Sequence, residues 1–466
     1  MALNRWRLLT AAKAWLVLAS LFFYSYWNPA YLWLIVASLL VNYAIGTALT
    51  QPKPKTTLPP KLVLCLGVAF NLGLLLYYKY TGFLLQNLNG LLSSPIDIPT
   101  ILLPLAISFF TFQQVAYLVD CYQKRAQEYD FLNYTLFVTF FPQLIAGPIV
   151  HHQEMMPQFQ SARKKVFNPK LISLGLFTFF VGLSKKVLIA DTFADVANYG
   201  FAYEGAFSFI ESWLIAYAYG FQIYYDFSGY TDMALGLAFL FNIRLPLNFD
   251  TPYRATTLQD FWRRWHMTLS RFLRDYVYIP LGGNRNGQWL TYQNLFLTFL
   301  IGGIWHGAAW TFVIWGALHG AGLVLQRLWQ KLNIPLQPWV AGFITFHYVM
   351  LAWVFFRATS LDSAFRLVQS MVGLNGLTFK TGLPNPIQSF VDSARWFPAF
   401  TTGDFHSDIY LILLVVFLAI TVLIKQTDRF QERFHPTPAT ILLTLTLAIL
   451  GLSQLSQVSE FLYFNF

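Results

Sequence analysis

Charged residues are scarce in this sequence of 466 residues, since Asp, Glu, Lys and Arg together make up 11% of it. Soluble domains carry about 25% charged residues, so the composition excludes an ordinary soluble protein. Cysteine is also nearly absent. Cys65 and Cys121 lie in or beside apolar segments and have no metal-ligand spacing, which predicts neither a disulfide framework nor a zinc site.

Several motifs of soluble enzymes and of transporters are missing as well. The sequence contains no Walker loop, Rossmann fingerprint, HExxH motif or Ser-His-Asp order, which disfavours nucleotide-dependent, zinc-dependent and triad chemistry. It has no internal repeat and no pair of matching halves, which lowers the expectation of a secondary transporter. We predict no metal site and no permanently bound cofactor.

Hydrophobic residues are abundant, at 56% of the chain. We therefore predict an all-α polytopic membrane protein that forms a single domain over residues 1–466. About 11–12 apolar segments, each near the ~20 residues that a bilayer requires, are expected to include re-entrant or broken helices. The segments cover residues 8–27, 30–49, 61–79, 99–119, 131–150, 171–190, 206–225, 290–306, 308–328, 338–356, 409–424 and 438–456.

The net charge of +10 is spread over short loops, which argues against nucleic-acid binding and instead predicts topology through the positive-inside rule. Asp191–Ala206 contains acidic residues and no Lys or Arg, so we expect this loop outside and the N-terminus in the cytoplasm. Basic groups at 124–125 and 163–170 then lie on the same side. Phe131–Val150, which contains two prolines and a glycine, is therefore expected to enter the membrane and return as a broken helix.

Ile301–Gly320 is an apolar run that carries two histidines, His306 and His319. An ionisable group at membrane depth costs a few kcal/mol and usually serves function. Three glycines bracket His306 and predict a chain break or a close backbone approach. On one continuous helix the two histidines would be about 20 Å apart, so they could share a reaction centre only if the chain breaks at Gly307. We therefore favour His306 as the reactive residue and give His319 a supporting role.

Thr257–Asp275 predicts an amphipathic surface helix near residues 258–274, opened by Thr257 with Asp260 three residues later. Its aromatic residues share one face with His266, and its arginines share the other. The stretch 251–290 holds six arginines and two acids. Arginine suits phosphate, so this face could bind lipid headgroups or a polyanionic donor such as acetyl-coenzyme A. The candidate cofactor-binding residues are Arg263, Arg264, Arg271, Arg274 and Arg285.

Two other polar stretches lie in or at the edge of apolar segments. Gln113, Gln114 and Asp120 are expected to form interhelical hydrogen bonds, with a cavity-lining role as the alternative. Asp226 is expected to cap a helix that starts at the following glycine, with orientation of a histidine as the alternative.

At four blocks the sequence resembles the membrane-bound O-acyltransferase family, and within it the bacterial alginate O-acetyltransferase branch. The blocks are Phe141–Ile149, Gln222–Leu237, Asn248–Arg285 and Gly302–Gly320, and they define a motif core over about residues 141–320. The essential histidine of the family falls on His306, and its second associated histidine falls on His266. His319 also occurs in the pattern of this branch.

The resemblance implies a multi-pass enzyme of the bacterial inner membrane that takes an acetyl group from acetyl-coenzyme A on the cytoplasmic side. The acetyl group is then passed across the membrane to an extracytoplasmic polysaccharide, with a periplasmic or membrane acetyltransferase as partner protein. We hypothesise that His306 acts as general base while His266 orients the donor or polarises its carbonyl. The alternatives are a transporter of polysaccharide or acyl carrier, a non-catalytic scaffold, and D-alanyl transfer to a cell-envelope polymer.

Overall fold

The structure is a computed structural model that describes residues 9–51, 58–128, 130–161, 167–377, 434–457 and 462. These residues form helices and contain no β-strand, which confirms the predicted all-α class. The α-helices are α2 (Leu9–Trp27), α3 (Leu32–Thr50), α4 (Pro60–Leu75), α5 (Thr81–Asn89), α6 (Ile107–Tyr122), α7 (Phe131–Thr139), α8 (Phe141–Leu144), α9 (His152–Gln160), α10 (Pro169–Ser184), α11 (Asp191–Ala202), α12 (Phe209–Leu240), α13 (Leu258–Arg264), α14 (Met267–Leu273), α15 (Gln288–His306), α16 (Trp310–Lys331), α17 (Pro338–Arg357), α18 (Leu361–Met371) and α22 (Pro438–Ser453). Three π-helical turns, η2 (Leu76–Tyr80), η4 (Lys185–Ala190) and η6 (Arg274–Tyr278), continue α4, α10 and α14.

Five helical segments of the described part are long and apolar enough to cross a membrane, so the chain is a multi-pass membrane protein. Two of them run through a π-helical turn. The predicted segment 409–424 lies outside the described residues, so the predicted total of about 11–12 segments stays a prediction. The five segments are Leu9–Tyr26, Pro29–Thr50, Pro60–Asn89, Pro169–Ala202 and Pro338–Arg357.

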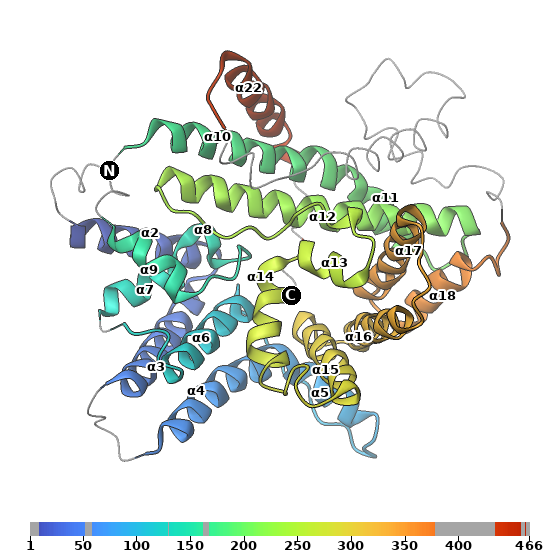
Figure 1. The fold of residues 1–466 in the computed structure, drawn as a ribbon, viewed down its shortest axis with the longest axis horizontal. Helices are drawn as coiled ribbons and strands as arrows, with labels where there is room; N and C mark the ends of the chain where they lie inside the picture. Colours follow the sequence, from blue (N-terminus) through green and yellow to red (C-terminus); the bar gives the residue numbers. More distant parts are fainter. Residues whose placement is uncertain are drawn as a thin grey trace.

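Helices α10 and α12 lie side by side along one edge of the molecule, with α22 against α10 (Figure 1). Glycines allow this approach, because a Cβ on Gly182 would lie 2.5 Å from the carbonyl oxygen of Gly229. Small residues are the usual means by which membrane helices come close. Two buried lysines of η4 extend the interface, since Lys185 pairs with Asp232 at 2.6 Å and Lys186 with Asp226 at 2.9 Å.

The ion pair of Asp226 corrects the sequence interpretation of this residue. Asp226 lies in the middle of α12, where it cannot cap a helix, and α12 runs on without interruption to Leu240. Its carboxylate contacts Lys186 and accepts a hydrogen bond from the backbone N–H of Leu462. The capping prediction failed because α12 continues through the glycine and Asp226 pairs with η4 instead of starting a helix.

The polar residues of α6 confirm the prediction of interhelical hydrogen bonds. Gln114 donates from Nε2 to Ser38 Oγ on α3 at 2.7 Å and accepts from the hydroxyl of Tyr134 on α7 at 2.6 Å. Asp120 accepts a hydrogen bond from the hydroxyl of Tyr276 at 3.0 Å. These side chains therefore hold α3, α6, α7 and η6 together.

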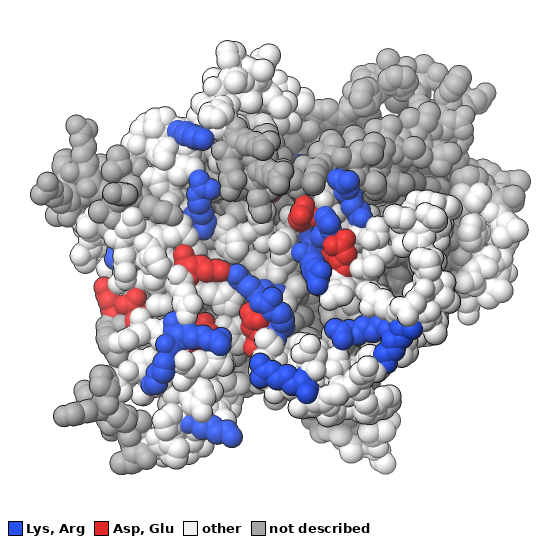
Figure 2. Space-filling view, in the orientation of Figure 1, with Lys and Arg blue, Asp and Glu red and all other residues white. Residues whose placement is uncertain are grey.

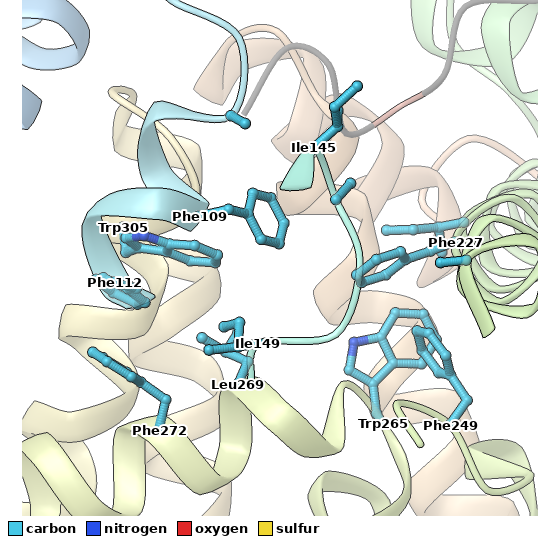
Figure 3. Close-up of a cluster of buried hydrophobic side chains, with 14 of the residues drawn as sticks. Phe109, Phe112, Ile145, Ile149, Phe227, Phe249, Trp265, Leu269, Phe272 and Trp305 are labelled. Atoms are coloured by element: carbon cyan, nitrogen blue, oxygen red, sulfur yellow. The ribbon is translucent and has the colours of Figure 1, made fainter. Parts of the chain in front are cut away.

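The stretch 131–150 is broken, as predicted. It forms α7 and the short α8, and the remaining residues run as irregular backbone between buried side chains (Figure 3). Only glycine fits at Gly147, where a Cβ would lie 2.4 Å from Gln143 Cα. The backbone N–H of Ile149 donates to Thr268 Oγ1, so protein groups satisfy irregular backbone that lipid could not.

Helices α13 and α14 occupy the centre of the view in Figure 1, between the N-terminal helices and the α15–α16 pair. Thr257 caps α13 by accepting from the backbone N–H of Asp260, as predicted. The predicted single helix is interrupted, however, because His266 has a left-handed backbone with φ 42°. The aromatic face of the stretch 258–274 is buried in protein, because Trp262 and Trp265 belong to the hydrophobic core.

Helices α15 and α16 form an antiparallel hairpin, and the chain breaks at Gly307 as predicted. Gly303 faces Gly316 so closely that a Cβ on Gly303 would lie 2.4 Å from the carbonyl oxygen of Phe312. A Cβ on Gly307 would lie 2.0 Å from the ring of Phe312. The glycines around His306 therefore serve close helix packing and the turn itself.

We predict that Gly303→Ala destabilises the protein, because the added methyl group overpacks the α15–α16 contact, at a cost of about 1–3 kcal/mol. Gly73→Ala in α4 is the matched control, since nothing lies within 4 Å of its added Cβ. The measurement is thermal unfolding in detergent followed by tryptophan fluorescence. Equal midpoints for the two variants would contradict the packing argument.

Candidate active site

His306 is the last residue of α15 and is 3% exposed. Its ring packs against three aromatic side chains, with centroid distances of 4.8 Å to Trp305, 5.0 Å to Trp315 and 5.1 Å to Phe356. The next residue, Gly307, is extended, so the backbone leaves the helix immediately after the histidine. The predicted reactive residue therefore lies at a helix end inside the protein.

His319 lies closer to His306 than the continuous-helix argument allowed. Because α16 folds back on α15, Trp315 contacts both rings, with centroid distances of 5.0 Å to His306 and 4.9 Å to His319. The chain break at Gly307, which the sequence set as the condition for a shared centre, is therefore met, and the distance along a continuous helix does not separate the two histidines. The indole N–H of Trp262 donates to His319 Nδ1 at 3.2 Å, which places the proton of a neutral His319 on Nε2.

His266 is fully buried at the junction between α13 and α14. Its Nδ1 lies 2.9 Å from Asn248 Oδ1, which also accepts from the backbone N–H of Thr268. That backbone contact identifies the Asn248 atom as oxygen, so His266 donates from Nδ1 and carries its lone pair on Nε2. Among the described residues, His266 Nε2 has no hydrogen-bond partner.

We call His266, His306, His319 and Lys79 the histidine cluster. Lys79 donates to the carbonyl oxygen of His306, and the Trp315 ring contacts the rings of both His306 and His319. The Trp353 ring contacts His319 and the ring of Trp265, the residue before His266. The structure thus brings together the two predicted catalytic residues, His306 and His266, and adds His319. Within the described ranges, no three potential ligands from His, Cys, Asp and Glu lie close enough to hold a metal ion.

Sequence reasoning missed Lys79, which is partly buried and lies against the end of α15. Its Nζ donates to the carbonyl oxygens of Trp305 at 2.6 Å and His306 at 2.9 Å. The neighbouring Tyr80 donates from its hydroxyl to the carbonyl oxygen of Ile304 at 2.6 Å. The available signal was a lysine inside the long apolar stretch Pro60–Asn89, where a charge is costly.

A cavity of about 500 Å³ adjoins the cluster, and we call it the arginine cavity. Trp262 forms part of its wall and also binds His319, so the cavity and the histidine cluster share one side chain. Four arginines line it, three of them predicted from the sequence. These are Arg263, Arg271, Arg274 and Arg327. Arg327 was missed because it lies on α16, far from the arginine-rich stretch.

The five predicted arginines differ in their partners. Arg271 forms a two-bonded ion pair with Glu154, and Arg274 pairs with Asp275, whose hydrogen bond raises the pKa of the Arg274 guanidinium. Arg264 pairs with Asp260 instead of lining the cavity.

Of the two remaining predicted arginines, Arg263 lines the cavity and Arg285 does not. Arg285 lies in the glycine-rich turn after α14, where Gly282 and Gly283 have positive φ, and is not part of the cavity lining. Within the described ranges, Arg263 and Arg327 are the cavity arginines without an ion pair.

The distribution of surface charge matches this arrangement. On the face shown in Figure 2, basic side chains with acidic ones between them gather over the central elements. The central elements in the same view of Figure 1 are α13 and α14. This charged centre suits a polar ligand.

The family model and the similar proteins all point to O-acyltransferases. The model of the family described as MBOAT, membrane-bound O-acyltransferase family, matches residues 96–365. The peptidoglycan O-acetyltransferase of Helicobacter pylori is 44% identical over 488 residues, which cover 97% of this chain and 91% of that protein.

Two further relatives are more distant. A Pseudomonas aeruginosa protein named "Probable alginate O-acetylase AlgI" is 40% identical over 365 residues, with 76% of this chain and 69% of that protein covered. The teichoic acid D-alanyltransferase of Bacillus subtilis is 29% identical over 54% of this chain and 68% of that protein. The family match and these identities, together with the membrane-spanning helices and the buried histidines, show that the chain belongs to the membrane-bound O-acyltransferase family and is an acyltransferase.

Proposed function

We propose that this protein takes an acetyl group from acetyl-coenzyme A at the cytoplasmic face of the inner membrane and passes it across for O-acetylation of an extracytoplasmic polysaccharide. The observation that carries the proposal is the contact between the arginine cavity and the histidine cluster through Trp262. A polyanionic donor matches the arginines, and a thioester on a long flexible arm can reach a buried histidine. The named activities of the peptidoglycan and alginate relatives support a polysaccharide acceptor.

His306 is the general base of the proposed reaction. Its imidazole takes the proton of an acceptor hydroxyl, whose oxygen attacks the acetyl carbonyl carbon. A new C–O bond forms, the C–S bond breaks, and coenzyme A leaves as a thiolate. The thiolate then takes from His306 the proton that came from the acceptor hydroxyl. No strong acid is required, because a thiol has a pKa of about 8.5 and its thiolate leaves readily.

We propose for His266 a role other than orienting the donor or polarising its carbonyl. Polarising a carbonyl requires an N–H donor, whereas His266 already uses its Nδ1 proton on Asn248 and holds a lone pair on Nε2. A buried acceptor of this kind fits a hydroxyl group. We therefore assign His266 to holding the attacking hydroxyl by accepting its hydrogen bond.

The arginine cavity holds the phosphates of the donor. Arg263 and Arg327 have their guanidinium groups available for bidentate contacts with phosphate oxygens. Arg271 keeps its ion pair with Glu154, so we assign it no phosphate contact. Because the acceptor polymer lies outside the membrane, a periplasmic or membrane acetyltransferase is the expected partner for the final transfer.

We predict that His306→Ala lowers acetyl transfer by about 10²–10⁴-fold, because it removes the general base. The measurement is transfer of labelled acetyl from acetyl-coenzyme A by protein in proteoliposomes, with peptidoglycan and alginate fragments as acceptors. His347→Ala is the matched control, since His347 pairs with Tyr217 elsewhere in the structure. A folded His306→Ala variant with wild-type transfer would refute the assignment, and substrate flux without transfer would favour a transporter.

We predict that Arg263→Gln and Arg327→Gln each raise the KM for acetyl-coenzyme A by about tenfold with little change in kcat. Each variant removes one contact with a phosphate, and a hydrogen bond to a charged group contributes about 1.5–3 kcal/mol. The effect should shrink at high salt, which screens exposed charges. Arg244→Gln is the control, since Arg244 packs over Phe239 outside the cavity. An unchanged KM in both variants would mean that these arginines bind lipid headgroups.

A further inference from the structure

Helix α15 ends at two buried residues, Trp305 and His306, and the carbonyl groups of its last turn have no hydrogen-bond partner within the helix. The last four carbonyl groups of any helix lack an intrahelical hydrogen bond, and burial makes each costly unless another group binds it. Here three consecutive carbonyl oxygens, those of Ile304, Trp305 and His306, all accept hydrogen bonds from one π-helical turn. That turn, η2, therefore fixes the helix end that carries the proposed base.

Lys79 makes the central contacts of this arrangement. Its ammonium group spans the carbonyl oxygens of Trp305 and His306, donates to Ser108 Oγ at 3.2 Å on α6, and lies 5.8 Å from the centre of the Trp305 ring. A cation at a helix C-terminus also interacts favourably with the helix dipole. The same side chain thus ties α15 to η2 and α6 at the one residue after which α15 stops.

Two successive residues of the π-helical turn η2 reach the same helix end. Lys79 binds the carbonyl oxygens of Trp305 and His306, and the hydroxyl of Tyr80 donates to the carbonyl oxygen of Ile304. π-Helical turns are frequently found at functional sites.

We propose that Lys79 is a positioning residue of the acyl-transfer site. It holds the final turn of α15 so that the His306 ring stays in line with the reacting groups, although the chain turns sharply at Gly307. This inference rests on the proposed function for its kinetic readout. A small displacement of a reacting group lowers rate far more than donor affinity, because orientation determines the chemical step.

The test compares Lys79→Met with wild-type protein in proteoliposomes. We expect kcat to fall about 10–100-fold with the KM for acetyl-coenzyme A within twofold of wild type, and Lys79→Arg to restore part of kcat. Lys124→Met is the matched control, because Lys124 donates in the same way to the carbonyl oxygen of Leu49 at the end of α3. Its kcat should stay unchanged.

A second readout does not depend on acyl transfer. Carbethoxylation of His306 by diethyl pyrocarbonate, measured by peptide mass spectrometry, should be faster in Lys79→Met than in wild type because the helix end loosens. If wild type transfers no acetyl group, the proposed function fails while this measurement still tests the positioning of His306. Wild-type kcat in Lys79→Met, or a raised KM at unchanged kcat, would overturn the inference.

A third variant covers the case in which Lys79→Met does not fold. Tyr80→Phe removes only the hydroxyl that binds the Ile304 carbonyl oxygen. We expect a smaller loss of kcat and faster modification of His306 in this variant. A folded Tyr80→Phe with wild-type kcat and wild-type modification would overturn the inference as well.

Discussion

The structure depends on one constraint, which is that polar groups within a bilayer must find their partners inside the protein. Three departures from regular apolar helix meet this constraint through contacts with neighbouring elements. The irregular backbone after α8 is bound by Thr268, the amide of Gln114 is bound by α3 and α7, and the end of α15 is bound by η2. The breaks that a reaction centre requires are therefore tolerated only where neighbouring elements bind the freed groups.

The same constraint explains which features were predictable from the sequence. The class, the broken stretch 131–150 and the chain break at Gly307 follow from composition and from proline and glycine, whose effects are local. Asp226 was misjudged because its partner, Lys186, lies on a helix that is distant in sequence. The sequence tied the proximity of His319 to a break at Gly307, but only the fold shows that α16 returns along α15 and brings Trp315 against both rings.

Other features could not be predicted because they arise from contacts across the fold. Nothing local requires His266 to adopt φ 42°, and helix periodicity instead favoured a continuous helix through it. Arg327 reaches the arginine cavity from α16 only because α13 packs on that helix. Lys79 did carry a local signal, a charge in an apolar span, but its target on α15 is visible only in three dimensions.

The ion pairs between η4 and α12 have a consequence for biogenesis. A charged side chain in a membrane segment raises the cost of insertion by roughly 2.5–3.5 kcal/mol, and Lys185 meets its partner Asp232 only on the later helix. The segment that begins with α10 therefore carries an uncompensated charge until α12 has been synthesised. Stable insertion of the α10–η4 segment into the membrane therefore depends on α12. A chain that stops before α12 lacks Asp232, the group that neutralises Lys185.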